Sequence, residues 1–496
     1  MLLSKIKNFW LEILLFIVIF CVYLNNVAPA FTWVSYDHDL GDFVFSAKYG
    51  SVIHFPGFPI YTALSWIAIR IPYGHEGWRL AFWVSMLPAM ISVVCVYLAV
   101  LKQTSIRSYA IVAGLALAGS NIFMSQSTIA EVYSLSACFI TLTYTSLVYE
   151  RYRLAAIFGG LSFGVHAFSA AAVVAMFVWS KDLRKRVWLF LPFAILPYSI
   201  VIIGGTQVGS LSMVSGDTYG FIQFALGALA DNMKWWFSLP VWQVPGKIGM
   251  FAMLMITSFG VAIIPAVRHA MDVKKSRLLL ACMFVPIIYF LGEVVDQTIV
   301  HLYLAVPFIA IAAGIGMSKT KLSPVYVSAI SLALLLTFPF FYDIGNNLDE
   351  TMSAQKTYDQ LDEIPDGSII AGLGRWERNN QTLLLGVSGR EQTLIETYNK
   401  ESERKLVPFN VSLYGSGMEV KGFGTIGRWY AGELTNKYGM ATPVVPDIEG
   451  LGEERIRQYW EIIDIIVREN PDRPLFYSLV PENNPRERIL TQYIPQ

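Results

Sequence analysis

Long apolar runs alternate with short polar stretches over the first 345 residues of the chain. The runs approach 20 residues, the length at which a helix crosses the hydrocarbon core of a bilayer. Because lipid offers no partner to backbone N–H and C=O groups, spans of this kind are helical. The runs lie near residues 9–30, 78–101, 108–124, 133–149, 187–205, 248–267, 278–295, 301–318 and 323–342. This pattern predicts a polytopic α-helical membrane protein.

One apolar stretch is too short for its position. Arg151 and Arg153 precede it and the basic residues of 181–186 follow it, and basic residues mark cytoplasmic turns. The residues between them, about 27, are too few for two full spans. We therefore predict a pair of short helices that turn at 164–166 and carry His166 outward, since broken helices are tolerated where they line a cavity. The membrane part then has about eleven segments, two of them short.

The pattern changes from about residue 346, where apolar runs shorten and Asp, Glu, Arg and Asn become frequent. Residues 368–373 and 474–480 have the composition of buried strands, and 453–469 has the spacing of an amphipathic helix. A unit of roughly 150 residues is an ordinary domain. We predict a membrane domain over 1–345, with its first outer loop at 31–77, and a soluble extracytoplasmic α/β domain over 346–496.

Composition narrows the class of partner. The chain has 496 residues, of which 54% are hydrophobic and 15% charged, and its formal net charge is zero. A neutral chain gives no sign of a nucleic-acid partner. The four cysteines lie inside apolar runs without the spacing of metal ligands, so neither a disulfide framework nor a zinc site is indicated.

A polar island follows the first span. Asp37, Asp39 and Asp42 stand within six positions, and the segment 43–61 behind them is apolar enough to predict an interfacial amphipathic helix. An ionised side chain at membrane depth costs about 2.5–3.5 kcal/mol on insertion scales, so acids at a bilayer usually serve ions, protons or substrates. Clustered carboxylates could accept a proton from an acceptor hydroxyl, bind a divalent cation, or do both. The plain alternative is a solvated acidic loop.

These residues resemble a known family. The sequences Asp-Leu-Gly-Asp at 39–42 and His-Phe-Pro-Gly-Phe-Pro-Ile-Tyr at 54–61 resemble the Asp-Ser-Gly-Glu and His-Pro-Pro-Gly-Tyr-Pro-Leu-Tyr signature of the DUF2723 membrane proteins. That family includes the TMEM260-type protein O-mannosyltransferases, among the GT-C glycosyltransferases. Residues 126–135 and 164–166 resemble its Ala-Glu-Val-Tyr segment and its Gly and His near the paired short helices. Residues 347–370 resemble its passage into a soluble domain.

The resemblance implies an inverting transfer of mannose or another hexose. The donor would be a polyprenyl-phosphate sugar in the outer leaflet, and the acceptor an extracytoplasmic protein Ser/Thr, glycan or lipid. Asp39 is the base by motif position and Asp42 the second choice. Leu40, Phe55 and Asp42 depart from the family's Ser, Pro and Glu, which leaves the base open between the two aspartates.

Further residues are candidates for substrate binding. His301-Leu302-Tyr303 resembles the Arg-x-Tyr of GT-C enzymes with His in the Arg position, and a neutral imidazole binds phosphate less firmly. The substrate-binding candidates are Asp37, His54, Arg79, Glu131, Tyr133, His166, His301 and Tyr303. No cofactor is certain, and Asp42 and Glu131 are the candidates for a divalent cation.

Simpler roles stand beside these. His54 could cap the turn at 56–57, Glu131 could be an acid favoured at a helix start, and His166 could be a packing residue. A polytopic transporter or lipid-linked sugar flippase is the alternative function, although such proteins usually carry charge in mid-span and show internal symmetry. A receptor or scaffold would not need the acids. The host membrane would be a prokaryotic plasma membrane or the endoplasmic reticulum, with the site on its extracytoplasmic or lumenal side.

Overall fold

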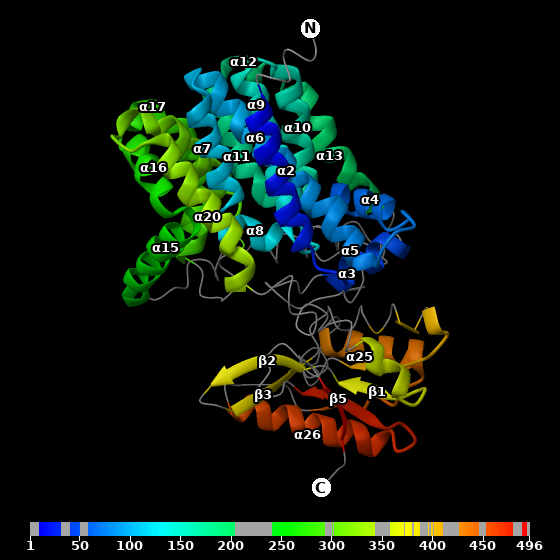
Figure 1. Cartoon of the computed structure of the whole chain (residues 1–496). Coiled ribbons are helices and arrows are strands. Elements are labelled where there is room, and N and C mark those ends of the chain that lie inside the picture. The colour runs from blue at the N-terminus through cyan, green and yellow to red at the C-terminus, as the bar shows by residue number, and fades with distance from the viewer. Residues whose placement is uncertain are drawn as a thin grey trace.

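The computed structural model describes most of the 496-residue chain. The described residues are 9–30, 40–49, 58–203, 241–292, 300, 302–342, 358–371, 373–378, 381–386, 395, 398–399, 401–409, 426–445, 453–479 and 489–493. They form a helical bundle and, beyond it, a smaller C-terminal α/β unit (Figure 1).

The bundle follows the predicted apolar runs closely. Its first half comprises α2 (Trp10–Asn25), α3 (Leu40–Tyr49), α4 (Pro59–Ala68), α5 (Glu76–Leu80), the π-helix η2 (Ala81–Met86), α6 (Leu87–Thr104), α7 (Arg107–Ala118), α8 (Asn121–Ser127) and α9 (Val132–Val148). Its second half comprises α10 (Tyr152–Val165), η3 (Ala167–Ser169), α11 (Ala170–Trp179), α12 (Lys181–Arg184), α13 (Val187–Ile203), η4 (Val241–Gln243), α15 (Val244–Phe259), η5 (Gly260–Ala262), α16 (Ile263–Ala270), α17 (Val273–Gly292), α19 (Val306–Gly316), η6 (Met317–Lys319) and α20 (Pro324–Tyr342).

Few of these helices are full spans. Within the described residues, two continuous helical stretches, Glu76–Thr104 and Val244–Ala270, are long and apolar enough to cross a membrane. A third span results if α7 and α8, which meet at a 59° bend, are counted together. Seven further apolar helical stretches have only 10–17 residues that meet the same description. Two or three spans are thus found within the described residues, and the number of about eleven membrane segments stays a prediction.

Glycine and proline affect how these helices pack. At Gly119, between α7 and α8, a Cβ atom would lie 2.4 Å from the carbonyl oxygen of Ser331, so α20 passes too close for any other residue. α13 continues through Pro192 and Pro197, although each proline removes a backbone hydrogen bond from the helix.

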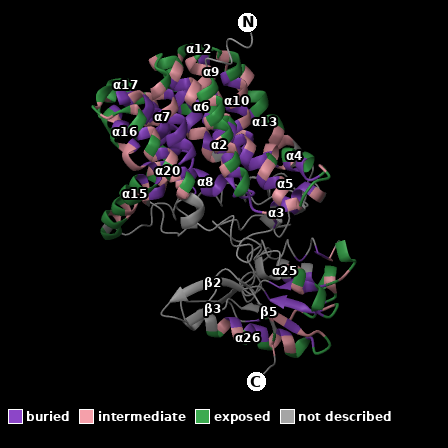
Figure 2. Cartoon of the chain, in the orientation of Figure 1, coloured by how far each residue is buried: buried purple, intermediate pink, exposed green. Residues whose placement is uncertain are grey.

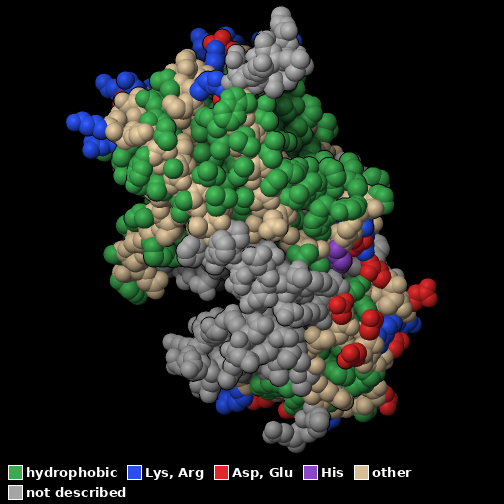
Figure 3. Space-filling model, in the orientation of Figure 1, with side chains coloured by type: hydrophobic (Ala, Val, Ile, Leu, Met, Phe, Trp, Pro, Cys, Tyr) green, Lys and Arg blue, Asp and Glu red, His purple; other side chains and the backbone are tan. Residues whose placement is uncertain are grey.

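Small residues let the central helices approach closely. α19 contributes a fully buried run that includes Ala310, Ala313 and Gly314, and a Cβ at Gly314 would lie 2.8 Å from the Ala113 Cβ on α7. Large apolar side chains also cover the outside of the bundle, among them Trp10, Ile17 and Trp188 (Figures 2 and 3). Helices that are hydrophobic on both faces are typical of a lipid environment.

The pair of short helices is confirmed. α10 ends at Val165, His166 is its C-cap, and α11 begins at Ala170 after one turn of 3₁₀ helix. The single interfacial helix predicted over 43–61 is wrong, because α3 already begins at Leu40 and a separate helix, α4, begins at Pro59. Proline is favoured at the first position of a helix, so Pro59 starts a new helix rather than continuing the previous one.

The C-terminal unit is built on a four-stranded sheet of order β4-β1-β5-β6. The strands β4 (Val407–Phe409), β1 (Ile369–Ala371) and β5 (Leu475–Leu479) are parallel, and β6 (Ile489–Gln492) is antiparallel to β5. A hairpin of β2 (Leu373–Arg378) and β3 (Gln381–Gly386) and the helices α25 (Ile426–Tyr438) and α26 (Glu453–Glu469) complete it. β1, β5 and α26 occupy the predicted ranges.

The two ends of the bundle differ. α12 and α17 lie at one end, where Lys and Arg side chains gather (Figures 1 and 3). α3, α5 and α8 lie at the other end, which faces the C-terminal unit (Figure 1).

Candidate functional site

Three of the predicted site residues come together, and a fourth, Glu131, lies two residues before one of them. Glu131, Tyr133, His166 and Tyr303 belong to the start of α9, the break between α10 and α11, and the turns before α19. Ring contacts join three of them, because the Tyr133 ring lies 5.4 Å from the His166 ring and 6.4 Å from the Tyr303 ring, centroid to centroid. Residues far apart in the sequence therefore build one polar and aromatic cluster.

Five of the remaining six candidates cannot be placed by their side chains, and the sixth, Arg79, is described below. Asp37, Asp39, His54 and His301 lie outside the described residues. Asp42 belongs to the first turn of α3, and its side chain is outside the description.

His166 is fixed by its own turn. Its Nδ1 accepts a hydrogen bond from the Phe168 backbone N–H at 3.1 Å, and its carbonyl oxygen accepts one from the Ser169 hydroxyl at 2.8 Å. Since Nδ1 is an acceptor, the neutral imidazole carries its proton on Nε2. The ring stacks on Phe58, with centroids 5.2 Å apart and an interplanar angle of 13°. The ring is thus oriented from both sides, with a donor on Nε2.

Phe58 is itself constrained. It is the residue before Pro59, its φ is 24° and its ψ is 55°, and a non-glycine residue in this region is strained by on the order of 1–3 kcal/mol. The residue is 3% exposed, and its ring also contacts Phe43 of α3, at 6.5 Å between centroids. Close packing therefore holds the end of the Pro-Gly-Phe-Pro motif against His166.

α10 reaches this position because of a glycine. At Gly164 a Cβ atom would lie 2.8 Å from Cγ1 of Ile60 on α4. A larger residue would push α10 away from α4 and separate His166 from Phe58. In the Gly-Val-His sequence at the helix break, the glycine is thus required for packing and the histidine supplies the polar side chain.

Tyr303 is the fully buried member of the cluster. Its hydroxyl lies 2.8 Å from Ser127 Oγ on α8 and 2.8 Å from Ser134 Oγ on α9, and all three side chains are buried. The ring stacks on Phe123 at 4.9 Å. A buried hydroxyl with two partners is well satisfied, so Tyr303 holds α8, α9 and the segment before α19 in register.

Glu131 caps α9. The residue is 3% exposed, and its Oε2 accepts a hydrogen bond from the Val132 backbone N–H at 3.2 Å. Its backbone N–H donates to Ser85 Oγ at 3.0 Å, and the same hydroxyl donates to the Glu131 carbonyl oxygen at 3.0 Å. The helix-start role therefore holds. A carboxylate this deeply buried in a membrane fold is also a functional-site candidate by default.

Arg79 has a structural environment. Its guanidinium donates to the carbonyl oxygens of Ile69, Tyr73 and Gly74, with distances of 3.1 Å to Tyr73 and 2.8 Å to Gly74. These bonds fix the turn between α4 and α5. The structure does not bring Arg79 into the cluster around His166, and we leave it out of the proposed site.

Metal binding gains no support from the described part of the chain, in which no three His, Cys, Asp or Glu side chains converge. A role of Asp42 or Glu131 in binding a divalent cation stays a prediction, because the Asp42 side chain lies outside the description.

Serines were missed as site residues. Ser85, Ser127 and Ser134 are fully buried and join η2, α8 and α9 through hydrogen bonds. The signal in the sequence was weak, because a serine in an apolar helix usually bonds its own backbone. The density of serines between residues 120 and 136 was the feature of the sequence that could have indicated a polar cluster.

The comparisons with known proteins address the fold. No protein-family model and no curated protein sequence matches the chain. Two solved structures resemble it, ArnT from Cupriavidus metallidurans in the apo state and the same protein bound to undecaprenyl phosphate. Each comparison has a TM-score of 0.56 and 10% sequence identity and covers 95% of this chain and 93% of ArnT.

ArnT is a GT-C glycosyltransferase. The likeness shows that the chain shares the fold of ArnT, which is the predicted GT-C membrane fold. At this identity the likeness shows the fold alone, and membership of the DUF2723 family stays a prediction.

Proposed function

We propose that this protein is a membrane glycosyltransferase that takes its sugar from a polyprenyl-phosphate donor. The observation that carries the proposal is the cluster of Glu131, Tyr133, His166 and Tyr303, assembled at one end of a GT-C fold from residues chosen by sequence motif. Polar groups buried in a membrane fold usually mark a substrate pathway. One structure of the same fold has undecaprenyl phosphate bound.

The proposed reaction is a single displacement. The oxygen of an acceptor hydroxyl attacks the anomeric carbon, the bond from that carbon to the phosphate oxygen breaks, and the electron pair leaves with polyprenyl phosphate. The hydroxyl proton passes to a carboxylate, for which Asp39 and Asp42 are the candidates by motif. Attack opposite the leaving group inverts the anomeric centre. General-base assistance of this kind contributes roughly 10²–10⁴-fold.

The described residues would bind the departing phosphate and the sugar, and hold the helices of the site in place. We assign to His166 a hydrogen bond from Nε2–H to the departing phosphate, where negative charge develops and a fixed donor is most effective. Tyr133, which contacts both His166 and Tyr303, would lie against the sugar. Glu131 would bind sugar hydroxyls while it caps α9. Tyr303 would hold α8 and α9 in place through its hydrogen bonds to Ser127 and Ser134.

The finer features belong to the same proposal. The donor would carry mannose or another hexose, and the acceptor would be a protein Ser/Thr, a glycan or a lipid. Residues 346–496 would form a soluble domain on the extracytoplasmic side. The basic end of the bundle at α12 (Figure 3) favours that orientation, because Lys and Arg gather on the cytoplasmic side of membrane proteins.

Binding of the leaving group gives a test that does not require the sugar to be known. Purified protein in detergent is titrated with undecaprenyl phosphate, and thermal unfolding is recorded. A ligand that binds only the folded state raises the unfolding temperature. We expect stabilisation by undecaprenyl phosphate and none by undecaprenol, which lacks the phosphate. Equal responses to both would contradict a phosphate site.

Turnover separates the proposal from its alternative. The protein is incubated with labelled polyprenyl-phosphate mannose or glucose and an extract of acceptors. Label on an acceptor, with release of polyprenyl phosphate, supports the transferase. Movement of labelled donor across vesicles without transfer would show a transporter or flippase instead.

A further inference from the structure

Lys48 joins the helix that carries Asp42 to the C-terminal unit. It lies in the last turn of α3, and its Nζ is 2.7 Å from Oε2 of Glu76 in the first turn of α5. The same ammonium donates a hydrogen bond to Oε1 of Glu401, 353 positions further along the chain. One cation therefore bridges two elements of the bundle and one of the C-terminal unit.

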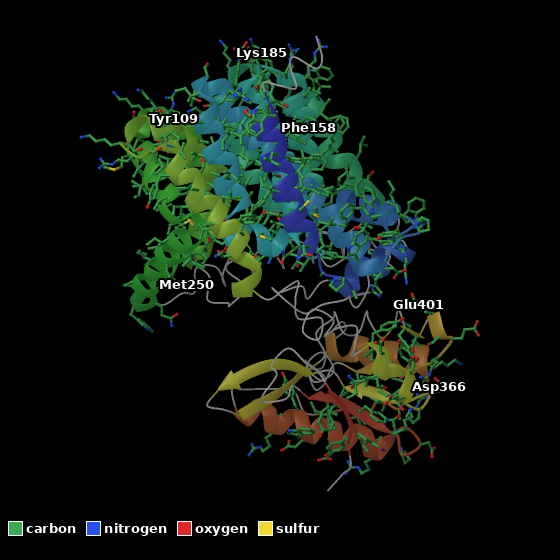
Figure 4. All side chains as sticks on the ribbon, viewed as in Figure 1. Tyr109, Phe158, Lys185, Met250, Asp366 and Glu401 are labelled. Carbon is green, nitrogen blue, oxygen red and sulfur yellow. The ribbon has the colours of Figure 1, made fainter. Side chains whose placement is uncertain are left out.

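Residues of the C-terminal unit hold the Glu401 carboxylate in place. Its Oε2 accepts a hydrogen bond from the Tyr358 hydroxyl at 2.5 Å, and the Tyr358 ring meets Tyr398 edge to face at 5.3 Å. Arg404 donates to the Tyr398 hydroxyl at 2.9 Å and to the carbonyl oxygen of Leu361 at 2.8 Å. Glu401 lies at the edge of the C-terminal unit that faces the bundle (Figure 4). The carboxylate is thus presented by an organised surface.

The ion pair is more protected than an ordinary surface pair. The Lys48 side chain is 19% exposed, against 59% for Lys185 in its pair with Asp182 at the other end of the bundle. Burial alone would lower the pKa of Lys48, but its hydrogen bonds to Glu401 and Glu76 raise the pKa above the ordinary value. Exposed pairs contribute little, whereas partly buried pairs are less screened.

α3 transmits the position of this contact. Asp42 and Lys48 are six residues apart in one ten-residue helix, and six residues span roughly 9 Å of helix. Phe43, the neighbour of Asp42, packs on Tyr61 with centroids 4.6 Å apart. A shift of the last turn therefore shifts the acidic first turn against α4.

We propose that Lys48 is a positioning residue, and that its ion pair with Glu401 fixes α3 so that its first turn, which carries Asp42, is set only when the C-terminal unit is docked. This inference rests on the proposed function for its catalytic part. The C-terminal unit thereby acts on the site through α3, in addition to any contact it makes with an acceptor. Loss of the ion pair lowers turnover more than donor binding, because a small misplacement of a catalytic group can reduce rate by about 100-fold.

The test compares Glu401→Gln and Lys48→Met with Lys48→Arg, which keeps a positive charge facing both Glu76 and Glu401. Lys185→Met, which removes an exposed pair far from the C-terminal unit, is the matched control. Hydrogen exchange of the peptide 40–49 and the kcat and KM of transfer are measured in the full-length protein. We expect Glu401→Gln and Lys48→Met to speed exchange and to lower kcat about tenfold or more, with KM for the donor nearly unchanged. Lys48→Arg should restore both.

The outcomes test separately whether Glu401 holds α3 and whether this contact positions the catalytic residues. Unchanged exchange in Glu401→Gln overturns the link between the two parts of the chain, and faster exchange with unchanged kcat overturns the positioning role. Wild-type exchange in Lys48→Arg together with faster exchange in Glu401→Gln supports the pair even if Lys48→Met fails to fold. If the wild-type protein transfers no sugar, the proposed function fails, while the exchange comparison still decides whether Glu401 holds α3.

Discussion

The imidazole of His166 stacks on the ring of Phe58 with centroids 5.2 Å apart and planes 13° from parallel. This contact joins the break between α10 and α11 to the start of α4, and so unites two sequence motifs more than a hundred residues apart. The His166 ring is oriented by packing on one side and by the Phe168 N–H on the other.

Replacing His166 should separate its capping and chemical roles. In His166→Asn the side-chain oxygen can still accept from the Phe168 N–H, whereas the Nε2 donor and the ring are lost. We expect near wild-type unfolding temperature and a fall in kcat of about 100-fold, typical for removal of one donor to developing negative charge. Initial rates with polyprenyl-phosphate sugar measure it. A variant with full activity would make His166 a packing residue.

Glu131 can be tested by a matched pair of substitutions. Glu131→Gln keeps an oxygen to accept the Val132 N–H bond but removes the charge, and Glu131→Ala removes both. Loss of an N-cap costs about 0.5–2 kcal/mol, so only Glu131→Ala should unfold more readily in denaturant. Both should transfer sugar slowly. If Glu131→Gln is as active as the wild type, the cap accounts for Glu131 completely.

Tyr303→Phe should mainly lower the stability of the folded protein. The substitution removes the hydroxyl between Ser127 and Ser134 and leaves two buried hydroxyls with one partner fewer. Each serine keeps a backbone acceptor, Phe123 for Ser127 and Gln126 for Ser134, so the cost is that of the lost hydrogen bonds, about 0.5–1.5 kcal/mol each. Thermal unfolding in detergent would record it as a lower midpoint.

His75 gives the bundle a pH dependence. Its Nδ1 accepts from the Gly77 N–H and caps α5, and burial lowers its pKa below the ordinary value. Because the unfolded chain then binds the proton more readily, stability is full above the unfolded pKa of about 6.5 and falls as pH drops below it. Hydrogen exchange of residues 69–80 between pH 7.5 and 5 should show this loss. His75→Asn keeps a cap without titrating, and its exchange should follow only the intrinsic pH trend.

How far the sequence predicts the structure depends on the range of each interaction. The turn at His166 followed from a count of residues between basic clusters, and α26 at Glu453–Glu469 followed from its amphipathic spacing. Both signals are local. The separate start of α4 at Pro59 was also local, since proline is favoured at the first position of a helix, and a single helix over 43–61 overlooked it.

Other features depend on contacts between distant segments. The serines at 127 and 134 gain their role only when Tyr303 is placed beside them, and no periodicity in one sequence specifies that contact. The Lys48–Glu401 pair links residues 353 positions apart. Arg79 looked like an outward cation for phosphate, yet the nearby carbonyl oxygens of the α4–α5 turn use its donors.

The most direct test of the central claim is transfer of labelled sugar from a polyprenyl-phosphate donor by Asp39→Asn and Asp42→Asn, each beside the wild type in proteoliposomes. Asparagine has nearly the size of aspartate but cannot accept the proton. The proposed reaction predicts transfer by the wild type and a loss of about 10²–10⁴-fold in at least one variant, without loss of undecaprenyl phosphate binding. Wild-type rates in both variants, or no transfer by the wild type from any polyprenyl-phosphate sugar, would contradict it.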